Sequence, residues 1–157
     1  MILLLEEYWN MPISNLKRGK AQRGTFSGLQ CRYTSSRWME AAMGASVSLR
    51  GDTIWVEPYI RDYDEICGAK VTEENPWVRK LCQLTDELVK SSNGRYPVAA
   101  NEFMSPLTAL VELRGNTNFG FDLYDQPSEI KKALSELNRT WSALLLLQYK
   151  GTVKAIV

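Results

Sequence analysis

The chain has 157 residues, enough for one domain with a sizeable core, and its 45% hydrophobic and 24% charged residues are typical of a soluble globular protein. With 19 basic and 18 acidic residues, the net charge of +1 gives no reason to expect a nucleic-acid partner or an anionic membrane. The lack of histidine and the three widely spaced cysteines argue against a serine-hydrolase triad, a metal site and a disulfide framework.

Two apolar runs near the ends of the chain are too short to act as targeting or membrane segments. Residues 2–5 fall below the roughly 7–15 apolar residues of a signal-peptide core. Residues 143–149 fall far below the ~20 residues that a membrane-spanning helix needs. We therefore expect a cytoplasmic protein with no membrane partner.

The first half of the chain predicts short helices and one hairpin. We expect an untidy helical region over 3–22, a loop over 23–28 and a short helix over 35–44. Two stretches with alternating apolar residues, separated by a Gly-Asp turn, predict a hairpin or strand–turn–strand unit over 46–60. The charged residues 61–65 are expected to form an exit loop.

The second half predicts mainly helices. The clearest spans 74–94, because an Asn-Pro start, apolar residues three and four apart and an Asn-Gly end all agree. A short apolar run predicts a strand over 96–100, followed by a helix over 105–115 and a helical segment over 116–124. The longest helix is predicted over 126–149, with one apolar face.

The strand predicted over 96–100 directs attention to the residues that follow it. Helix–strand–helix order favours βα units around a parallel sheet, and in such folds ligands bind at the carboxyl ends of the strands. Asn101 and Glu102 would lie at such an end and are our candidates for substrate binding. The alternative is that Asn101 caps a turn and Glu102 is solvated near the next helix start, where a carboxylate is favoured.

Two other charged residues are open to two interpretations. The planar guanidinium of Arg37 could bind a substrate carboxylate, or it could form a structural ion pair. Glu57 could be an acid at the rim of a pocket, or simply a loop residue before Pro58. No catalytic residue can be assigned.

Three segments together resemble the uroporphyrinogen-decarboxylase-like superfamily. They are "GDTIWVEPYIRDYDEI" (51–66), "ENPWVRKLCQLTDELV" (74–89) and the long stretch 94–141. The most telling elements are "PLTALVELRG" and, after it, "FDLYDQPSEIKKAL". The resemblance is clearest over residues 35–141 and is specific to the superfamily rather than to one of its members.

The resemblance implies a (β/α)₈ barrel, which takes about 250 residues or more. We therefore expect one truncated domain over 1–157, an α/β fold formed by the N-terminal helices and first strands of a partial TIM barrel. The lone chain is expected to be inactive. Its open strand edge would favour a homodimer.

The resemblance also implies a function. A tetrapyrrole carboxy-lyase would need no metal or organic cofactor, and Asn101, Glu102 and Arg37 would bind the tetrapyrrole-like substrate. One alternative is a corrinoid-dependent methyltransferase domain with a corrinoid protein as partner, whose zinc ligands lie mostly in the C-terminal half. Another alternative is a truncated product without catalytic activity.

Overall fold

The computed structural model describes residues 37–50, 53–68, 71–94, 98 and 100–153. The helical region predicted over 3–22 and the loop predicted over 23–28 lie outside these residues. The elements, in chain order, are α2 (Trp38–Ala42), β1 (Ser46–Arg50), β2 (Thr53–Glu57), α3 (Asp64–Gly68), α4 (Pro76–Ser92), α5 (Pro106–Arg114), α6 (Asn116–Asp125) and α7 (Pro127–Val153).

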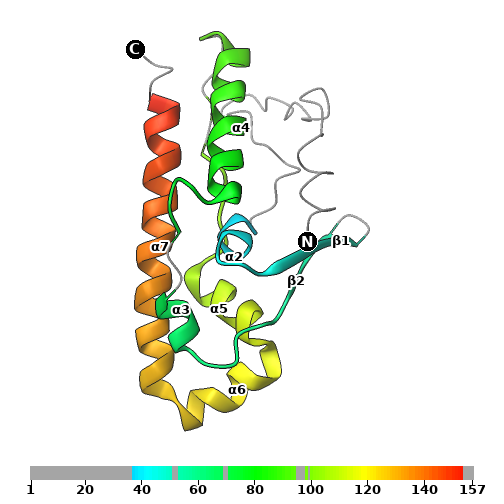
Figure 1. Ribbon diagram of the computed structural model, residues 1–157, viewed down its shortest axis with the longest axis vertical. Coiled ribbons are helices and arrows are strands. Elements are labelled where there is room, and N and C mark those ends of the chain that lie inside the picture. The colour runs from blue at the N-terminus through cyan, green and yellow to red at the C-terminus, as the bar shows by residue number, and fades with distance from the viewer. Residues whose placement is uncertain (1–36, 51–52, 69–70, 95–97, 99, 154–157) are drawn as a thin grey trace, which may run out of the picture.

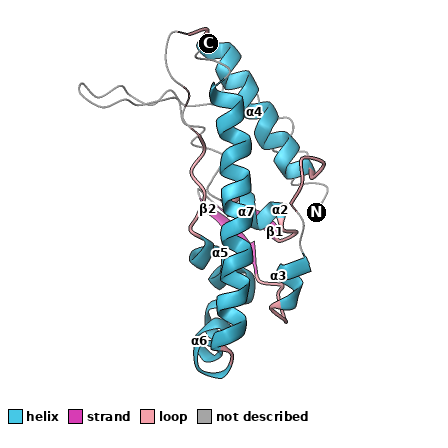
Figure 2. Ribbon diagram, turned by 90° about the vertical axis from the view of Figure 1, so that its left-hand side faces the viewer, coloured by secondary structure: helices cyan, strands magenta, loops and turns pink. Residues whose placement is uncertain are grey.

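Helix α7 runs along nearly the whole length of the molecule, and the other described helices pack against it (Figure 1). Helix α4 covers one half of α7, while α3, α5 and α6 lie along the other half, as the turned view also shows (Figure 2). The side of α7 that faces them carries Ile130, Ala133, Leu137 and Leu144, all buried. Their spacing of three, four and seven residues places them in one stripe, so the apolar face predicted from the sequence is confirmed.

The start of α4 shows how a local sequence signal also serves tertiary packing. The Asn75 Oδ1 atom accepts hydrogen bonds from the backbone N–H groups of Trp77 (2.9 Å) and Val78 (3.4 Å), which caps the helix. The Asn75 Nδ2 atom donates to the Ala42 carbonyl at the end of α2 (2.8 Å). One side chain therefore begins α4 and holds it against α2, and the predicted capping role of this Asn-Pro start is confirmed.

Helix α5 begins as predicted, with the Ser105 hydroxyl accepting from the Thr108 N–H at 3.2 Å. It ends at Gly115, whose φ of 86° is a conformation that favours glycine. Helix α6 starts directly after this residue, so Gly115 allows the sharp change of direction between the two helices.

The two described strands form an antiparallel hairpin, in which Ser46 pairs with Glu57 and Arg50 pairs with Thr53. This confirms the predicted hairpin. The chain leaves β2 toward α5, because the backbone N–H groups of Tyr59 and Ile60 both donate to the Leu113 carbonyl, at 3.0 and 3.1 Å. The hairpin is thus tied to the end of α5.

The prediction of a strand over 96–100 is wrong at the positions that the structure describes, since Val98 and Ala100 are in no strand. The parallel sheet predicted around it is not seen in the described part of the chain, where the sheet is the antiparallel hairpin. A strand needs a neighbouring backbone, but here the Asn101 N–H donates to the side chain of Gln148 in α7, at 3.1 Å. Gln148 is itself buried, and its Nε2 atom lies 3.5 Å from the Thr85 hydroxyl of α4.

Residues 64–68, in part predicted as a charged loop, form α3. The Glu65 carboxylate accepts from the N–H groups of Arg61 and Asp62, both at 2.9 Å. The Asp62 carboxylate in turn accepts from the Asp64 N–H at 3.0 Å. This is a capping-box arrangement, so the Asp62-x-x-Glu65 spacing was the signal for a helix start.

We expect Leu137→Ala to lower the free energy of unfolding by about 3 kcal/mol, because Leu137 is fully buried in the α7 stripe. Leu146→Ala, on the exposed side of the same helix, should change it by less than about 0.5 kcal/mol. Urea unfolding followed by circular dichroism measures both. If the two variants lost the same free energy of unfolding, the buried stripe of α7 would not be the main packing surface of this helix.

Candidate functional site

A pocket of about 580 Å³ lies between the hairpin and α5. Its volume falls in the range of small-molecule sites. Residues from the hairpin, from α5, from the start of α6 and from the residue before α2 line it: Arg37, Arg50, Ile54, Trp55, Val56, Glu57, Pro58, Thr108, Val111, Glu112, Gly115 and Asn116. Apolar and charged groups therefore share its walls.

Two ion pairs contribute the charges of the pocket wall. Arg37 Nη2 lies 2.6 Å from Glu112 Oε1, and both side chains are largely buried. Arg50 Nη2 lies 2.6 Å from Glu57 Oε1 at the exposed edge of the hairpin. The guanidinium of Arg50 also lies 5.7 Å from the centre of the Trp55 ring, which is 52% exposed. Two positive and two negative side chains leave the lining without net charge.

Behind the pocket lies a fully buried acid, Glu40 of α2. Its Oε1 atom is 4.0 Å from Arg37 Nη1, and neither of its oxygens has a hydrogen-bond partner among the described residues. Burial, with a smaller repulsion from Glu112, raises the pKa of Glu40 to about 7, although its own backbone N–H and Arg37 act in the opposite direction. Burial also raises the pKa of Glu112, against the opposing effect of Arg37.

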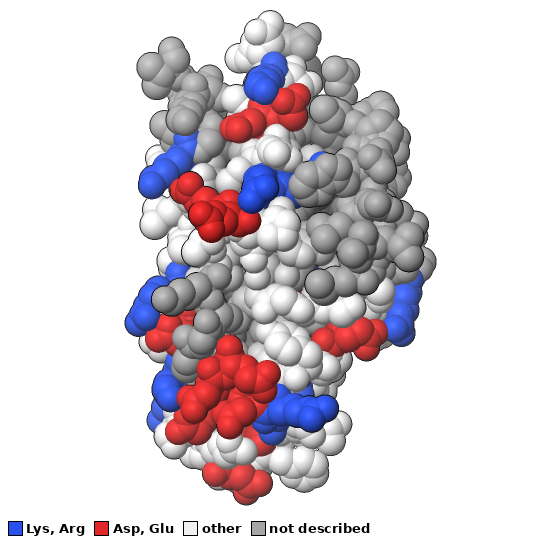
Figure 3. All heavy atoms as spheres, viewed as in Figure 1, with Lys and Arg blue, Asp and Glu red and all other residues white. Residues whose placement is uncertain are grey.

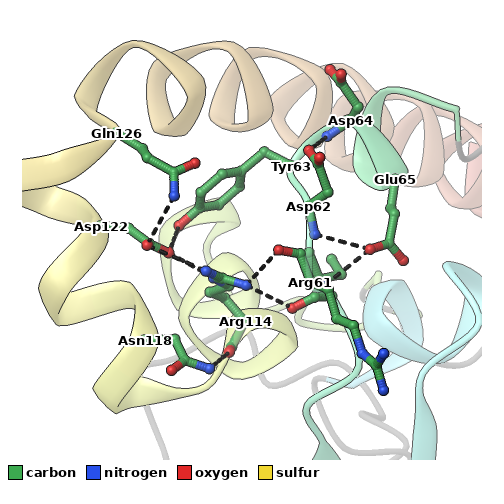
Figure 4. A network of polar contacts seen from close by, with 10 residues as sticks. Arg61, Asp62, Tyr63, Asp64, Glu65, Arg114, Asn118, Asp122 and Gln126 are labelled. Carbon is green, nitrogen blue, oxygen red and sulfur yellow. Dashed lines mark hydrogen bonds and ion pairs between the residues drawn. The ribbon is translucent and has the colours of Figure 1, made fainter.

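A second polar network lies at the junction of α5 and α6 (Figure 4). The Asp122 carboxylate accepts from the Tyr63 hydroxyl at 2.8 Å and from Arg114 Nε at 2.6 Å. Gln126 Nε2 approaches the same carboxylate at 3.4 Å. Arg114 Nη1 donates to the backbone carbonyls of Ile60 and Arg61, at 3.2 and 2.7 Å. The network joins the loop before α3 to α5 and α6.

The charges of this network are almost fully compensated. The hydrogen bond from Arg114 lowers the pKa of Asp122, while burial and the Asp122 carboxylate raise the pKa of Tyr63 to about 12. We interpret the network as a scaffold, since it leaves none of these groups poised to exchange protons near neutrality. Sequence reasoning missed it because Tyr63 and Asp122 are 59 residues apart and no local pattern connects them.

The structure separates the three residues proposed from the sequence as substrate-binding groups. Arg37 lies in the pocket wall, and its alternative role in an ion pair is seen. Glu102 is exposed, and Asn101 is held by Gln148; neither is among the residues that line the pocket. Glu57 does line it. A substrate-binding role for Asn101, Glu102 and Arg37 stays a prediction.

The remaining described surface carries mixed charges. On the face drawn in Figure 3, basic and acidic side chains alternate along the molecule, with the largest acidic group in the lower half. Within the described ranges, no three His, Cys, Asp or Glu side chains come together to hold a metal ion. No helix in that part of the chain is long and apolar enough to cross a membrane.

The chain resembles known proteins in its fold, although not detectably in its sequence. No protein-family model matches the chain, and a search of the curated proteins gives no match. The described part of this protein is mostly helical with a small two-stranded sheet. Among solved structures, it superimposes on part of a larger enzyme chain. The described part of this protein is therefore consistent with a partial α/β fold.

That enzyme is a methyltransferase from Methanosarcina mazei, which superimposes with a TM-score of 0.65 at 13% sequence identity. The match covers 79% of this chain and 37% of the methyltransferase. At this identity the likeness shows the fold alone. The chain spans well under half of the length of this structural neighbour.

We expect Glu40→Gln to stabilise the protein above neutral pH. The pKa of Glu40 is about 7 in the folded state against an ordinary 4.5, so the folded state binds this proton more tightly than the unfolded state does. Ionising the buried carboxyl therefore costs the native protein stability that the glutamine variant keeps. The difference should grow as the pH rises from about 4.5 to 7 and level off at about 3 kcal/mol.

Urea unfolding at about pH 5 and pH 8 measures this difference. Glu74→Gln is the matched control, because Glu74 is exposed and its loss should leave the pH dependence of the native protein unchanged. If the difference in stability between Glu40→Gln and the native protein were the same at both pH values, burial would not raise the pKa of Glu40.

Asp122→Asn should destabilise the protein by roughly 1.5–3 kcal/mol, because Arg114 loses its buried charged partner. Asp125→Asn, an exposed change in the same helix, should stay within about 0.5 kcal/mol. Thermal unfolding followed by circular dichroism compares the two. If Asp122→Asn were as stable as the control, the network would not be a scaffold.

Proposed function

We propose that this chain forms part of a methyltransferase with a uroporphyrinogen-decarboxylase-like fold. The observation that carries the proposal is the likeness to the methyltransferase over 79% of the chain. The sequence resemblance to the same superfamily, over residues 35–141, supports it independently. In this proposal the chain would bind the small molecule that gives or accepts the methyl group, and a corrinoid on a partner protein would supply the methyl-transfer chemistry.

The pocket between the hairpin and α5 suits the small molecule. Its volume of about 580 Å³ and its apolar surface, from residues such as Ile54, Val56 and Val111, fit a compact ligand. The role of this chain is to bind and orient that ligand. The half-exposed indole of Trp55, which lines the pocket, would offer an aromatic surface to a corrinoid on a partner protein.

The charge of the pocket separates this proposal from the tetrapyrrole carboxy-lyase. A porphyrinogen that carries many carboxylates needs a surplus of positive charge around it. Here Arg37 and Arg50 are each neutralised by a glutamate, so the lining has no such surplus. The lyase therefore remains the second candidate, supported by the sequence resemblance.

The described residues do not fit a zinc site, since they hold no group of three or more potential ligands and the chain contains no histidine. The role proposed for the described residues is therefore to bind the small molecule, with no zinc ligand among them. If the methyl transfer needs groups beyond these residues, the lone chain binds its ligands without turnover. A homodimer stays a prediction.

Thermal unfolding with two probes tests the proposal. Methylcobalamin at about 100 times its dissociation constant should stabilise the chain by about 2.7 kcal/mol and raise the melting temperature by several degrees, whereas uroporphyrinogen should not. Trp55→Ala should reduce the shift, and Leu146→Ala, which lies outside the pocket, should keep it.

A shift with uroporphyrinogen alone would favour the lyase. The absence of a shift with either probe would favour the third alternative, a product that has no catalytic site of its own.

A further inference from the structure

The pocket lies along the outer edge of β2. It is lined by Ile54, Trp55, Val56 and Glu57, which follow one another in this strand. Successive side chains of a strand point to opposite faces of the sheet, so a pocket above one face would meet only every second residue. A cavity that meets four residues in a row lies beside the strand, on the side away from β1, and therefore faces its backbone.

Helix α5 forms the other side of this pocket. Val111 and Glu112 follow Thr108 at three and four residues, which places all three lining residues on one side of the helix. At one end of the pocket the strand and the helix meet, because a Cβ atom added at Gly115 would lie 3.5 Å from the side chain of Pro58. The rest of the pocket separates the edge of β2 from α5.

Every second residue of β2 turns its backbone groups toward this pocket. Arg50 pairs with Thr53 across a connection of two residues, and such a hairpin connection closes with a hydrogen bond between the residues that flank it. Bonded and non-bonded pairs alternate along an antiparallel ladder. Trp55 therefore directs its N–H and C=O groups toward β1, whereas Ile54 and Val56 direct theirs outward.

These outward groups are available to a ligand. In the part of the chain that the structure describes, β1 is the only strand beside β2. No backbone hydrogen bond between described residues, outside the helices and the hairpin, involves Ile54 or Val56. The pocket thus presents an N–H and a C=O group from each of two residues, which is the pattern that a neighbouring strand would pair with.

The side chains around these backbone groups favour an uncharged ligand. Each guanidinium of the lining contacts a glutamate at 2.6 Å, Arg37 with Glu112 and Arg50 with Glu57. Apolar side chains of β2 and α5 share the wall with these pairs. Neither sign of charge is in surplus, so a charged ligand would be buried without compensation, whereas an uncharged polar ligand needs only hydrogen bonds.

We propose that the pocket binds its small molecule as an additional strand would be bound, through the outward N–H and C=O groups of Ile54 and Val56. The molecule is therefore an uncharged compound that carries an amide or a similar pair of donor and acceptor. This is the addition of a strand to a sheet edge, on the scale of a small ligand. The inference names the chemical class of the ligand, and it rests on the proposed function only for the use of that ligand in methyl transfer.

Nuclear magnetic resonance of the 157-residue chain, titrated with two matched amides, tests the proposal. N-acetylglycine N-methylamide carries N–H donors and carbonyl acceptors, whereas its N-methylated analogue, N-acetylsarcosine dimethylamide, keeps the carbonyls and has no donor. The first should shift the backbone N–H resonances of Ile54 and Val56. The second should bind at least about tenfold more weakly, because the outward carbonyls of the strand then receive no hydrogen bond.

Three results of this titration would overturn the proposal. Equal affinities for the two amides would show that the apolar wall, and not the strand edge, holds the ligand. Resonances of Ile54 and Val56 that neither amide shifts would show that the edge is not used. Tighter binding of free glycine, a zwitterion, would assign recognition to the two ion pairs.

Hydrogen exchange and a proline variant test the same strand edge in a second way. In the free native chain the amide protons of Ile54 and Val56 should exchange faster than that of Trp55, which is bonded to β1. Val56→Pro removes one outward donor at an edge position that tolerates proline, so it should weaken the binding of N-acetylglycine N-methylamide at least about fivefold. Val56→Thr keeps the N–H group and should bind this amide as the native chain does.

Slow exchange at both Ile54 and Val56, or binding that Val56→Pro leaves unchanged, would also overturn the proposal. Cobalamin is absent from both experiments, so their outcome is independent of the thermal-shift test of the proposed function.

Discussion

The structure depends above all on the burial of one stripe of side chains along α7. Helices α2 to α6 all contact this helix, and Ala133 and Leu137 at its centre are completely buried. Burial of apolar area is the main source of stability in a domain of this size. It also sets the position of α5, because α5 packs on α7 with one side and provides a wall of the pocket with another.

Two buried charge clusters that both include a residue from the last turn of α5 show contrasting ways to accommodate buried charge. Asp122 receives hydrogen bonds from Tyr63 and Arg114, so its charge is compensated and the cluster holds the helices in place. Glu40 receives none from the described residues, so its charge depends on pH. The satisfied cluster holds three segments of the chain together, whereas burial raises the pKa of the unsatisfied Glu40 to about 7.

The sequence predicted those parts of the fold that local patterns determine. The cap at Asn75, the turn of the hairpin and the stripe of α7 all depend on residues within a few positions of one another. A local pattern could not decide whether residues 96–100 form a strand, because a strand needs a neighbouring strand to pair with. For the site, the sequence singled out Arg37, but its neighbours Glu40 and Glu112 come together only through the packing of α2 on α5.

The buried amide of Gln148 has a consequence for how α7 aligns with its neighbours. Its oxygen accepts from the Asn101 N–H, and its nitrogen lies near the Thr85 hydroxyl of α4. An apolar stripe alone would tolerate a shift of α7 along its axis by one helical turn. Such a shift would bring Leu144 or Leu145 to this place and leave the Asn101 N–H without its acceptor, a cost of about 1–3 kcal/mol. A single polar residue thus selects one longitudinal alignment from several that hydrophobic packing permits.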